Sequence, residues 1–271
     1  MKTRVISGVV IAILLLVVLL SGGYVMAGVL MLLSFVAYNE LIRACGVHTE
    51  GVKVNGLELM GYIGIALHYF LMVIYKDAKV FIISVMFTFF VVMGVYVLTF
   101  PKYKAQQAIA AVFSFVYAPV MLSFIYMLRI MDDYGRFICW IPFVAWICDT
   151  FAYLSGMAFG KHKLAPVLSP KKTIEGSIGG TLASVITGGI FGYILSTNMV
   201  HNNNLIWVFM IITFVAAIVS QIGDLAASGI KRDHGIKDYG NIIPGHGGIM
   251  DRFDSVIFVA PMIYGLAVIM L

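Results

Sequence analysis

Apolar stretches of about twenty residues follow one another along almost the whole chain, separated by short polar segments. A helix of that length crosses the hydrocarbon core of a bilayer and satisfies its backbone hydrogen bonds internally. The composition fits this environment, because 61% of the 271 residues are hydrophobic and only 11% are charged, against about 25% charged in soluble domains. We therefore predict an all-α, polytopic integral membrane protein.

Nine membrane-spanning helices account for the apolar stretches. The first follows Lys2 and Arg4 as in a signal peptide, but apolar sequence resumes directly after Ser21-Gly22-Gly23, which favours an uncleaved helix. We predict an N-terminal region, 1–136, with about five helices, and a C-terminal region, 137–271, with polar loops at 160–175 and 229–250. The predicted spans are 5–20, 24–43, 57–75, 80–100, 105–128, 137–159, 175–196, 205–228 and 251–271.

The distribution of basic residues predicts the orientation. With nine spans, the side opposite the N-terminus holds only Lys76, Lys79, Arg129 and Arg136 of the 18 Lys and Arg residues. Cytoplasmic loops carry the excess of Lys and Arg. The N-terminus and both long polar loops are thus predicted to be cytoplasmic, and the C-terminus to lie outside.

Charge and cysteine content exclude two other classes. The formal net charge is +5, but no soluble basic segment with interleaved aromatic residues is present, so nucleic acid is not an expected partner. Cys45, Cys139 and Cys148 are an odd number of cysteines in apolar surroundings without Cys-x-x-Cys spacing. Neither a disulfide framework nor a zinc site is indicated.

The segment 228–254 is the most polar part of the chain. It combines Lys231, Arg232 and Lys237 with Asp238, Asp251, Asp254, His246 and several glycines. Lys and Arg suit phosphate oxygens, paired carboxylates suit a hard divalent cation, and glycines allow backbone N–H groups to approach a ligand closely. The segment is therefore predicted to form a phosphate and metal site at the membrane edge.

Carboxylates within apolar helices support this site, because burying them in hydrocarbon is costly and usually functional. Asp149 and Asp224 lie in the predicted sixth and eighth helices, and Asp251 and Asp254 lie three residues apart at the start of the ninth. We expect Asp224, Asp251 and Asp254 to hold a metal ion. Two alternatives stay open: Asp251 could be a helix N-cap, and Asp149 could bond to a neighbouring helix.

A second polar segment, 160–176, precedes the predicted seventh helix. Ser169-Pro170 followed by Lys171, Lys172 and Thr173 indicates a rigid turn whose hydroxyl groups, cations and helix N–H groups could face an anion. The order of glycine, lysine and hydroxyl residues differs from that of a Walker loop. A plain cytoplasmic anchor would also explain the lysines.

The predicted seventh helix carries small residues every four positions. They are Gly176, Gly180, Ser184, Gly188, Gly192 and Ser196. Such a stripe permits close approach of a neighbouring helix. Tight packing is the favoured interpretation, within the chain or between subunits, and a ligand groove is the alternative.

Two blocks of residues form recognisable motifs. The first is Asp149 with Ala152-Tyr153 and Gly156, continuing through Phe159-Gly160-Lys161, Lys163-Leu164 and Ser169-Pro170-Lys171-Lys172-Thr173 to Glu175-Gly176. The second is more specific and reads Ser228-x-Ile230-Lys231-Arg232-x4-Lys237-Asp238-x-Gly240-x2-Ile243-Pro244-x-His246-Gly247-Gly248-Ile249-x-Asp251-Arg252-Phe253-Asp254. Together they resemble the phosphatidate cytidylyltransferases, also called CDP-diacylglycerol synthases. The resemblance covers about 149–255, whereas the first 130 residues match only in being apolar.

The resemblance implies the reaction of CTP with phosphatidate to give CDP-diacylglycerol and pyrophosphate. It also implies Mg²⁺, with K⁺ as a possible second cation, and a homodimer in the inner membrane with its active site facing the cytoplasm. The residues expected to act in catalysis are Asp224, Asp251, Asp254, Lys231 and His246. Those expected to bind substrate are Asp149, Ser169, Lys171, Lys172, Thr173, Arg232, Lys237, Asp238 and Arg252.

Three other functions share part of this residue pattern. A CDP-alcohol phosphotransferase requires Asp-Gly-x2-Ala-Arg, but Leu225 follows Asp224 here. A CTP-dependent polyprenol kinase would transfer the γ-phosphate rather than the cytidylyl group. An ion-coupled transporter would also contain carboxylates within the membrane, but it would release no pyrophosphate.

Overall fold

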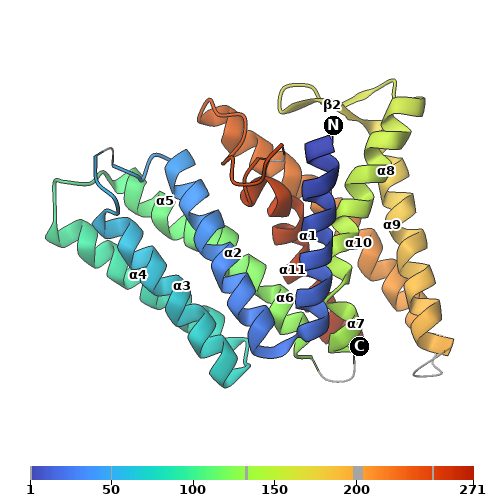
Figure 1. The fold of residues 1–271 in the computed structure, drawn as a ribbon, viewed down its shortest axis with the longest axis horizontal. Helices are drawn as coiled ribbons and strands as arrows, with labels where there is room; N and C mark the ends of the chain where they lie inside the picture. Colours follow the sequence, from blue (N-terminus) through green and yellow to red (C-terminus); the bar gives the residue numbers. More distant parts are fainter. Residues whose placement is uncertain (1, 50, 132–133, 198–203, 246) are drawn as a thin grey trace. The chain divides into compact units, whose positions relative to one another are not determined.

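The computed structural model (Figure 1) describes residues 2–49, 51–131, 134–197, 204–245 and 247–271. The chain divides into two compact units. Unit 1 contains Met1–Arg136 together with Asp233–Phe253, and unit 2 contains Phe137–Arg232 together with Asp254–Leu271. The segment 233–253 thus packs with the first half of the chain, although it is far from that half in sequence.

Unit 1 is a set of neighbouring apolar helices. Helix α2 packs against α1, α3 and α6, while α4 packs against α3 and α5. The path of the chain from α2 to α5 can be followed in Figure 1. The helices are α1 (Lys2–Ser21), α2 (Gly23–Ala44), α3 (Gly56–Tyr75), α4 (Lys79–Leu98), α5 (Ala105–Phe115) and α6 (Met121–Arg129).

The predicted fifth helix is continuous along its axis but not regular. A π-helical turn, η1 (Val116–Val120), joins α5 to α6 and contains Pro119. Proline has no N–H to donate within a helix, and its ring crowds the preceding turn, so the local hydrogen-bond pattern widens there. The predicted sixth helix is also interrupted, by the 3-10 turn η2 (Ile141–Phe143) between α7 (Gly135–Ile138) and α8 (Val144–Phe159).

Unit 2 contains α8 and the long helices α9 (Ile174–Leu195) and α10 (Asn204–Asp233), with most of α11 (Met250–Met270). A short antiparallel hairpin of β1 (Lys163–Ala165) and β2 (Ser169–Thr173) joins α8 to α9. Instead of the expected turn, 169–173 is therefore a strand. Pro170 keeps its predecessor Ser169 out of the helical region, which suits an extended backbone.

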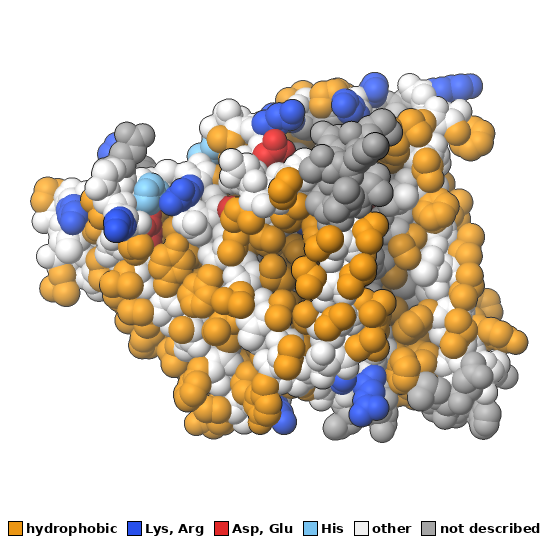
Figure 2. Space-filling model, viewed as in Figure 1, with side chains coloured by type: hydrophobic (Ala, Val, Ile, Leu, Met, Phe, Trp, Pro, Cys, Tyr) orange, Lys and Arg blue, Asp and Glu red, His pale blue; other side chains and the backbone are white. Residues whose placement is uncertain are grey.

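Eight helical stretches of the described chain are long and apolar enough to cross a membrane, and the apolar part of α1 is shorter, Gly8–Ser21. Hydrophobic side chains predominate along the sides of the helices in Figure 2, whereas the visible Lys and Arg side chains lie near helix ends. The predicted all-helical, polytopic membrane architecture is confirmed.

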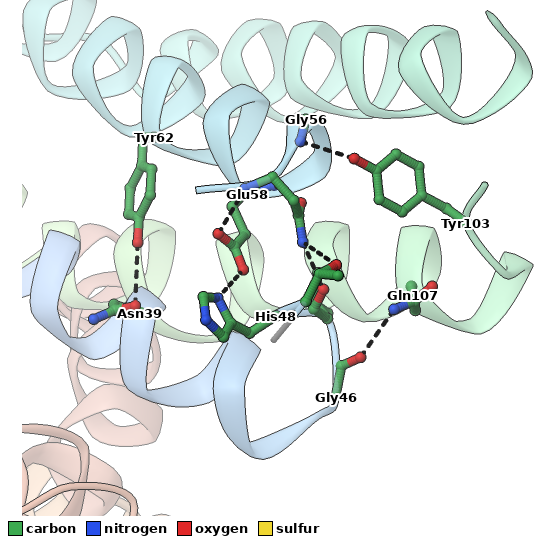
Figure 3. Close-up of polar contacts among 11 residues, drawn as sticks. Asn39, Gly46, His48, Gly56, Glu58, Tyr62, Tyr103 and Gln107 are labelled. Carbon is green, nitrogen blue, oxygen red and sulfur yellow. Dashed lines mark hydrogen bonds and ion pairs between the residues drawn. The ribbon is translucent and has the colours of Figure 1, made fainter. Parts of the chain in front are cut away.

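Polar side chains secure the loops of unit 1 at the start of α3 (Figure 3). Asn55 caps α3 by accepting the N–H of Glu58 at 3.0 Å, and the Glu58 carboxylate accepts the N–H of Asn55 at 3.0 Å. This reciprocal capping box satisfies two otherwise unpaired donors. His48 contacts the same carboxylate at 2.7 Å and Tyr103 accepts the N–H of Gly56 at 3.0 Å, so the loop before α3 is held at several points.

The small-residue stripe of α9 lies at helix contacts within unit 2. A Cβ added at Gly180 would lie 2.5 Å from the carbonyl oxygen of Cys148 in α8. One added at Gly188 would lie 2.7 Å from the carbonyl oxygen of Phe209 in α10. Tight packing, the favoured interpretation, is therefore confirmed at these two positions, and here the packing is within the chain. Only a missing side chain lets these backbones approach so closely.

Candidate functional site

In unit 2 the hairpin brings a cation to a membrane carboxylate. Lys172, on β2, forms an ion pair with Asp224, on α10, and both side chains are about three-quarters buried. Pairing of Lys163 with Thr173 and of Ala165 with Ser169 holds β2 in place. The structure thus joins Lys172, from the polar segment 160–176, to Asp224, one of the carboxylates that the sequence places within an apolar helix.

Thr173 has a structural contact in addition to its predicted role. Its hydroxyl oxygen accepts the N–H of Gly176 at 3.1 Å and so caps α9. A Cβ added at Gly156 or Gly160 would lie 2.9 Å from this hydroxyl. Gly156 and Gly160 therefore leave room for the Thr173 side chain, which caps α9, to pack closely against α8.

Glu175 closes the base of the hairpin. Its carboxylate accepts the N–H of Lys161 at 3.1 Å and the N–H of His162 at 3.2 Å, and it contacts His162 Nδ1 at 2.7 Å. These bonds tie the end of α8 to the first turn of α9. Lys161, Lys163 and Lys171 are exposed around the hairpin, whereas Lys172 points to Asp224.

A group of carboxylates lies near the Lys172–Asp224 pair in unit 2. Asp254 is buried, its Oδ1 accepts the N–H of Ser255 at 2.9 Å, and the charges of Asp224, Lys231 and Asp149 all act on it. Asp149 in turn accepts a hydrogen bond from the Ser255 hydroxyl at 3.3 Å. Three of the four predicted carboxylates therefore belong to one electrostatic group, and Asp149 also makes the interhelical bond weighed as its alternative.

Close backbone contacts allow this grouping. A Cβ added at Gly223 would lie 3.0 Å from the carbonyl oxygen of Asp254, so α10 and α11 approach closely beside Asp224. On the other side of α10, Gln221 donates to Thr181 at 3.1 Å and accepts a hydrogen bond from Ser177. These amide contacts orient α10 against α9.

Asp251 organises the glycine-rich segment within unit 1. Its Oδ2 accepts the N–H of Tyr239 at 2.8 Å and the N–H of Gly248 at 3.0 Å, and the residue is buried. Gly247 has a φ of 83°, a conformation for which glycine carries no steric cost. Asp251 lies inside the first turn of α11, and the two N–H groups that it accepts belong to residues before the helix. An N-cap precedes its helix and accepts N–H groups of the first turn, so Asp251 is not the N-cap of α11 but fixes the preceding segment.

The remaining predicted residues are distributed over both units. Lys231 and Arg232 lie in the last turn of α10, which extends beyond the expected end at Ser228, and they belong to unit 2. Lys237 and Asp238 are exposed in the segment that belongs to unit 1. Ser169 is half-buried on β2 and Arg252 is half-buried in the first turn of α11. His246 lies outside the described residues.

The described part of the chain contains no group of three or more His, Cys, Asp or Glu side chains placed to hold a metal ion. Mg²⁺ nevertheless needs only one or two protein carboxylates when phosphate oxygens and water complete its octahedron. Asp224 and Asp254 are two carboxylates in one electrostatic group. The donor set therefore fits a magnesium ion that is shared with a phosphorylated substrate.

Sequence reasoning missed Glu40, an acid near the end of the apolar α2. It is 4% exposed and accepts the N–H groups of Ile249 at 3.1 Å and Met250 at 2.8 Å. The signal was present, because a carboxylate in an apolar stretch is the same anomaly that singled out Asp149 and Asp224.

The apolar helices of unit 2 and its hairpin bring lysines together with carboxylates that are buried or partly buried. This combination is typical of a class of protein, the membrane-embedded enzymes that handle phosphorylated substrates. The chain belongs to the cytidylyltransferase family, because the model of that family matches residues 2–270.

Full-length relatives agree with this membership. The chain is 33% identical to the phosphatidate cytidylyltransferase of Staphylococcus saprophyticus over 270 residues, which cover 97% of each protein. It is 36% identical to the phosphatidate cytidylyltransferase of Staphylococcus aureus strain COL over 266 residues, again 97% of each. The similarity therefore includes the first 130 residues, which the sequence motifs left unmatched.

Proposed function

We propose that this protein transfers the cytidylyl group of CTP to phosphatidate, giving CDP-diacylglycerol and pyrophosphate. The observation that carries the proposal is the pairing of Lys172 with Asp224, beside the buried Asp254. It supplies a phosphate-binding cation next to metal-binding carboxylates at one place in the fold. The names of the full-length relatives support the choice of substrates.

The reaction requires little covalent chemistry from the protein. The phosphate of phosphatidate is itself the nucleophile, and pyrophosphate leaves from the α-phosphorus of CTP as the new P–O bond forms. The main obstacle is repulsion between two anions, so catalysis consists of positioning and charge stabilisation. Neither an activated serine nor an activated cysteine is needed.

The basic residues neutralise the substrates. We assign Lys172 and Lys231, which belong to unit 2 near Asp224 and Asp254, to phosphate oxygens at the reacting centre. Lys171, Arg232 and Lys237 are exposed and are assigned to the outer phosphates. Binding of an anion draws the Lys172 ammonium away from Asp224, which leaves that carboxylate available to a cation.

Asp224 and Asp254 would hold Mg²⁺, and Asp251 remains the predicted third ligand. When bound, the ion polarises phosphoryl oxygens and offsets charge on the leaving pyrophosphate. K⁺ as a second cation, a homodimer and a cytoplasm-facing active site are further parts of the proposal. The excess of Lys and Arg on one side of the predicted topology supports the orientation.

Labelled CTP tests the reaction. Purified protein in phosphatidate-containing micelles is given CTP labelled at the α- or the γ-phosphorus. The proposal expects α-label in the lipid product and γ-label in pyrophosphate, in equal amounts. Label from the γ-position in lipid would instead indicate a kinase, and absence of pyrophosphate would overturn the proposal.

A further inference from the structure

Glu40 is a buried acid that the proposed reaction does not use. It lies near the end of α2, in a span that is otherwise largely apolar, and it is 4% exposed. A buried carboxylate is costly unless hydrogen bonds compensate it. The contacts that compensate Glu40 therefore show what it does in the fold.

Those contacts come from the start of α11. Oε1 accepts the N–H of Ile249 at 3.1 Å, and Oε2 accepts the N–H of Met250 at 2.8 Å. The first N–H groups of a helix have no partner within the helix, and its N-terminus favours negative charge. Glu40 thus caps α11 from a helix more than two hundred residues away in the chain.

Two glycines make room for this carboxylate. A Cβ added at Gly240 or at Gly248 would lie 2.4 Å from Glu40 Oε1. Neither glycine has a positive φ, so space rather than backbone conformation requires glycine there. Both ends of the glycine-rich segment therefore lie against the same side chain.

Asp251 accepts hydrogen bonds from the same two ends of this segment. Gly248 donates its N–H to Asp251 at 3.0 Å while its Cα faces Glu40, and Tyr239 donates to Asp251 at 2.8 Å. Glu40 and Asp251 therefore contact the same two ends of the segment, 239–240 and 248–250.

We propose that Glu40 is a positioning residue of the reaction: it holds the glycine-rich segment 239–250 against the start of α11 and thereby sets the position of Asp251. This inference rests on the proposed function. Residues that orient a metal ligand affect metal affinity by about 10- to 100-fold. Loss of Glu40 should therefore appear in the metal dependence of the reaction.

The first test measures the stability of the segment 239–250 directly and does not depend on enzyme activity. Glu40→Gln keeps the size of the side chain but replaces one acceptor oxygen by an NH₂ group that faces an N–H donor. Amide hydrogen exchange of metal-free protein is expected to become at least about 10-fold faster in 239–250, with α3 and α4 unchanged. Unchanged exchange in this segment would overturn the proposal.

Glu58→Gln is the matched control. Glu58 is also a buried acid of unit 1 that accepts a backbone N–H, but it caps its own helix at Asn55. This variant is expected to leave exchange in 239–250 as it is. If Glu58→Gln and Glu40→Gln loosened the segment equally, Glu40 would be a general stability residue and the proposal would be wrong.

The second test is kinetic. Glu40→Gln is expected to raise the Mg²⁺ concentration for half-maximal pyrophosphate release about 10-fold, while KM for phosphatidate stays unchanged. Glu40→Asp, which keeps the charge, should recover part of the loss. Faster exchange together with wild-type Mg²⁺ dependence would overturn the proposal.

Gly248→Ala disturbs the contact between Gly248 and the Glu40 carboxylate while Glu40 itself is kept. This variant replaces Glu40→Gln if that protein does not fold. It should show the same altered Mg²⁺ dependence, and Glu40→Asp in the same chain should relieve it because the shorter side chain withdraws the carboxylate. If wild-type protein released no pyrophosphate, the proposed function would fail, whereas the exchange experiment would still decide whether Glu40 holds the segment.

Discussion

The ammonium group of Lys172 forms an ion pair with the carboxylate of Asp224. One residue comes from a strand between α8 and α9, and the other from within a 30-residue helix. Each charge neutralises the other, which lowers the cost of keeping a lysine and an aspartate partly buried among apolar helices.

Removal of the Lys172 charge should impair catalysis strongly. Lys172→Met is expected to lower kcat by about 100-fold, the usual cost of losing one preorganised donor. In a double-mutant cycle with Asp224→Asn the two effects should not add, because both residues act on the same substrate and ion. Pyrophosphate release measured for the four proteins checks this prediction.

The exposed pair of Lys79 and Asp77 is the control for that cycle. The Lys79 Nζ and Asp77 Oδ2 atoms are 3.5 Å apart, and the side chain of Lys79 is 84% exposed and that of Asp77 46% exposed. Exposed ion pairs contribute about 0–1 kcal/mol to stability, so Lys79→Met and Asp77→Asn should leave both turnover and the unfolding temperature close to wild type. Additive losses for Lys172 and Asp224 would contradict their joint role.

Asp254→Asn should remove the response to magnesium. We expect EDTA to abolish pyrophosphate release by wild-type protein and Mg²⁺ to restore it, and Mg²⁺ with CTP to raise the unfolding temperature. The variant should retain less than about one hundredth of wild-type kcat and lose that thermal shift, because a carboxylate ligand becomes a neutral amide.

Asp233→Asn provides the comparison, since Asp233 is 85% exposed at the end of α10. It is expected to respond to Mg²⁺ as wild type does. A folded Asp254→Asn protein with wild-type turnover and an intact thermal shift would remove Asp254 from the metal site.

Substitution within the small-residue stripe should destabilise unit 2. Gly180→Ala places a methyl group 2.5 Å from the backbone oxygen of Cys148, and overpacking of this kind costs about 1–3 kcal/mol. The unfolding temperature of the detergent-solubilised protein is expected to fall. Gly94→Ala in α4 meets nothing within 4 Å and should show no loss; equal behaviour of the two variants would contradict close packing of α8 on α9.

The predicted orientation can be checked by labelling. In a background lacking Cys45, Cys139 and Cys148, single cysteines replace Lys163 on the hairpin or Lys79 at the start of α4, both exposed positions. A membrane-impermeant maleimide should label the Lys79 position in intact cells and the Lys163 position only in inverted vesicles. Labelling of both positions from the same side would contradict the topology.

Much of the architecture was predictable because it depends on local chemistry. The lengths of the apolar stretches located the helices, since a bilayer leaves few other options for an unpaired backbone. The period-four glycines of α9 indicated close helix contacts, and α9 uses Gly180 and Gly188 in that way. Helix boundaries were less well predicted: α10 continues to Asp233 because Lys231 and Arg232 favour the negative end of its dipole.

The candidate site was predictable in composition but not in its pairings. Acids in apolar helices and lysines in polar segments identified Asp224, Asp254 and Lys172, but nothing in their spacing indicated that Lys172 pairs with Asp224. The position of Glu40 in an apolar stretch was visible in the sequence, but its partners were not predictable: they are the backbone N–H groups of Ile249 and Met250, and backbone donors leave no side-chain motif in a sequence.

By itself the sequence determined that this is a helical membrane protein with basic loops, buried acids and a cytidylyltransferase signature, because hydropathy, charge and residue order are properties of the chain alone. Only the tertiary structure decided that 233–253 packs with the first half of the chain, that Glu40 caps α11, and that a β-hairpin carries Lys172 to Asp224. These contacts join residues far apart along the chain, and their energies depend on burial and distance, which exist only after folding.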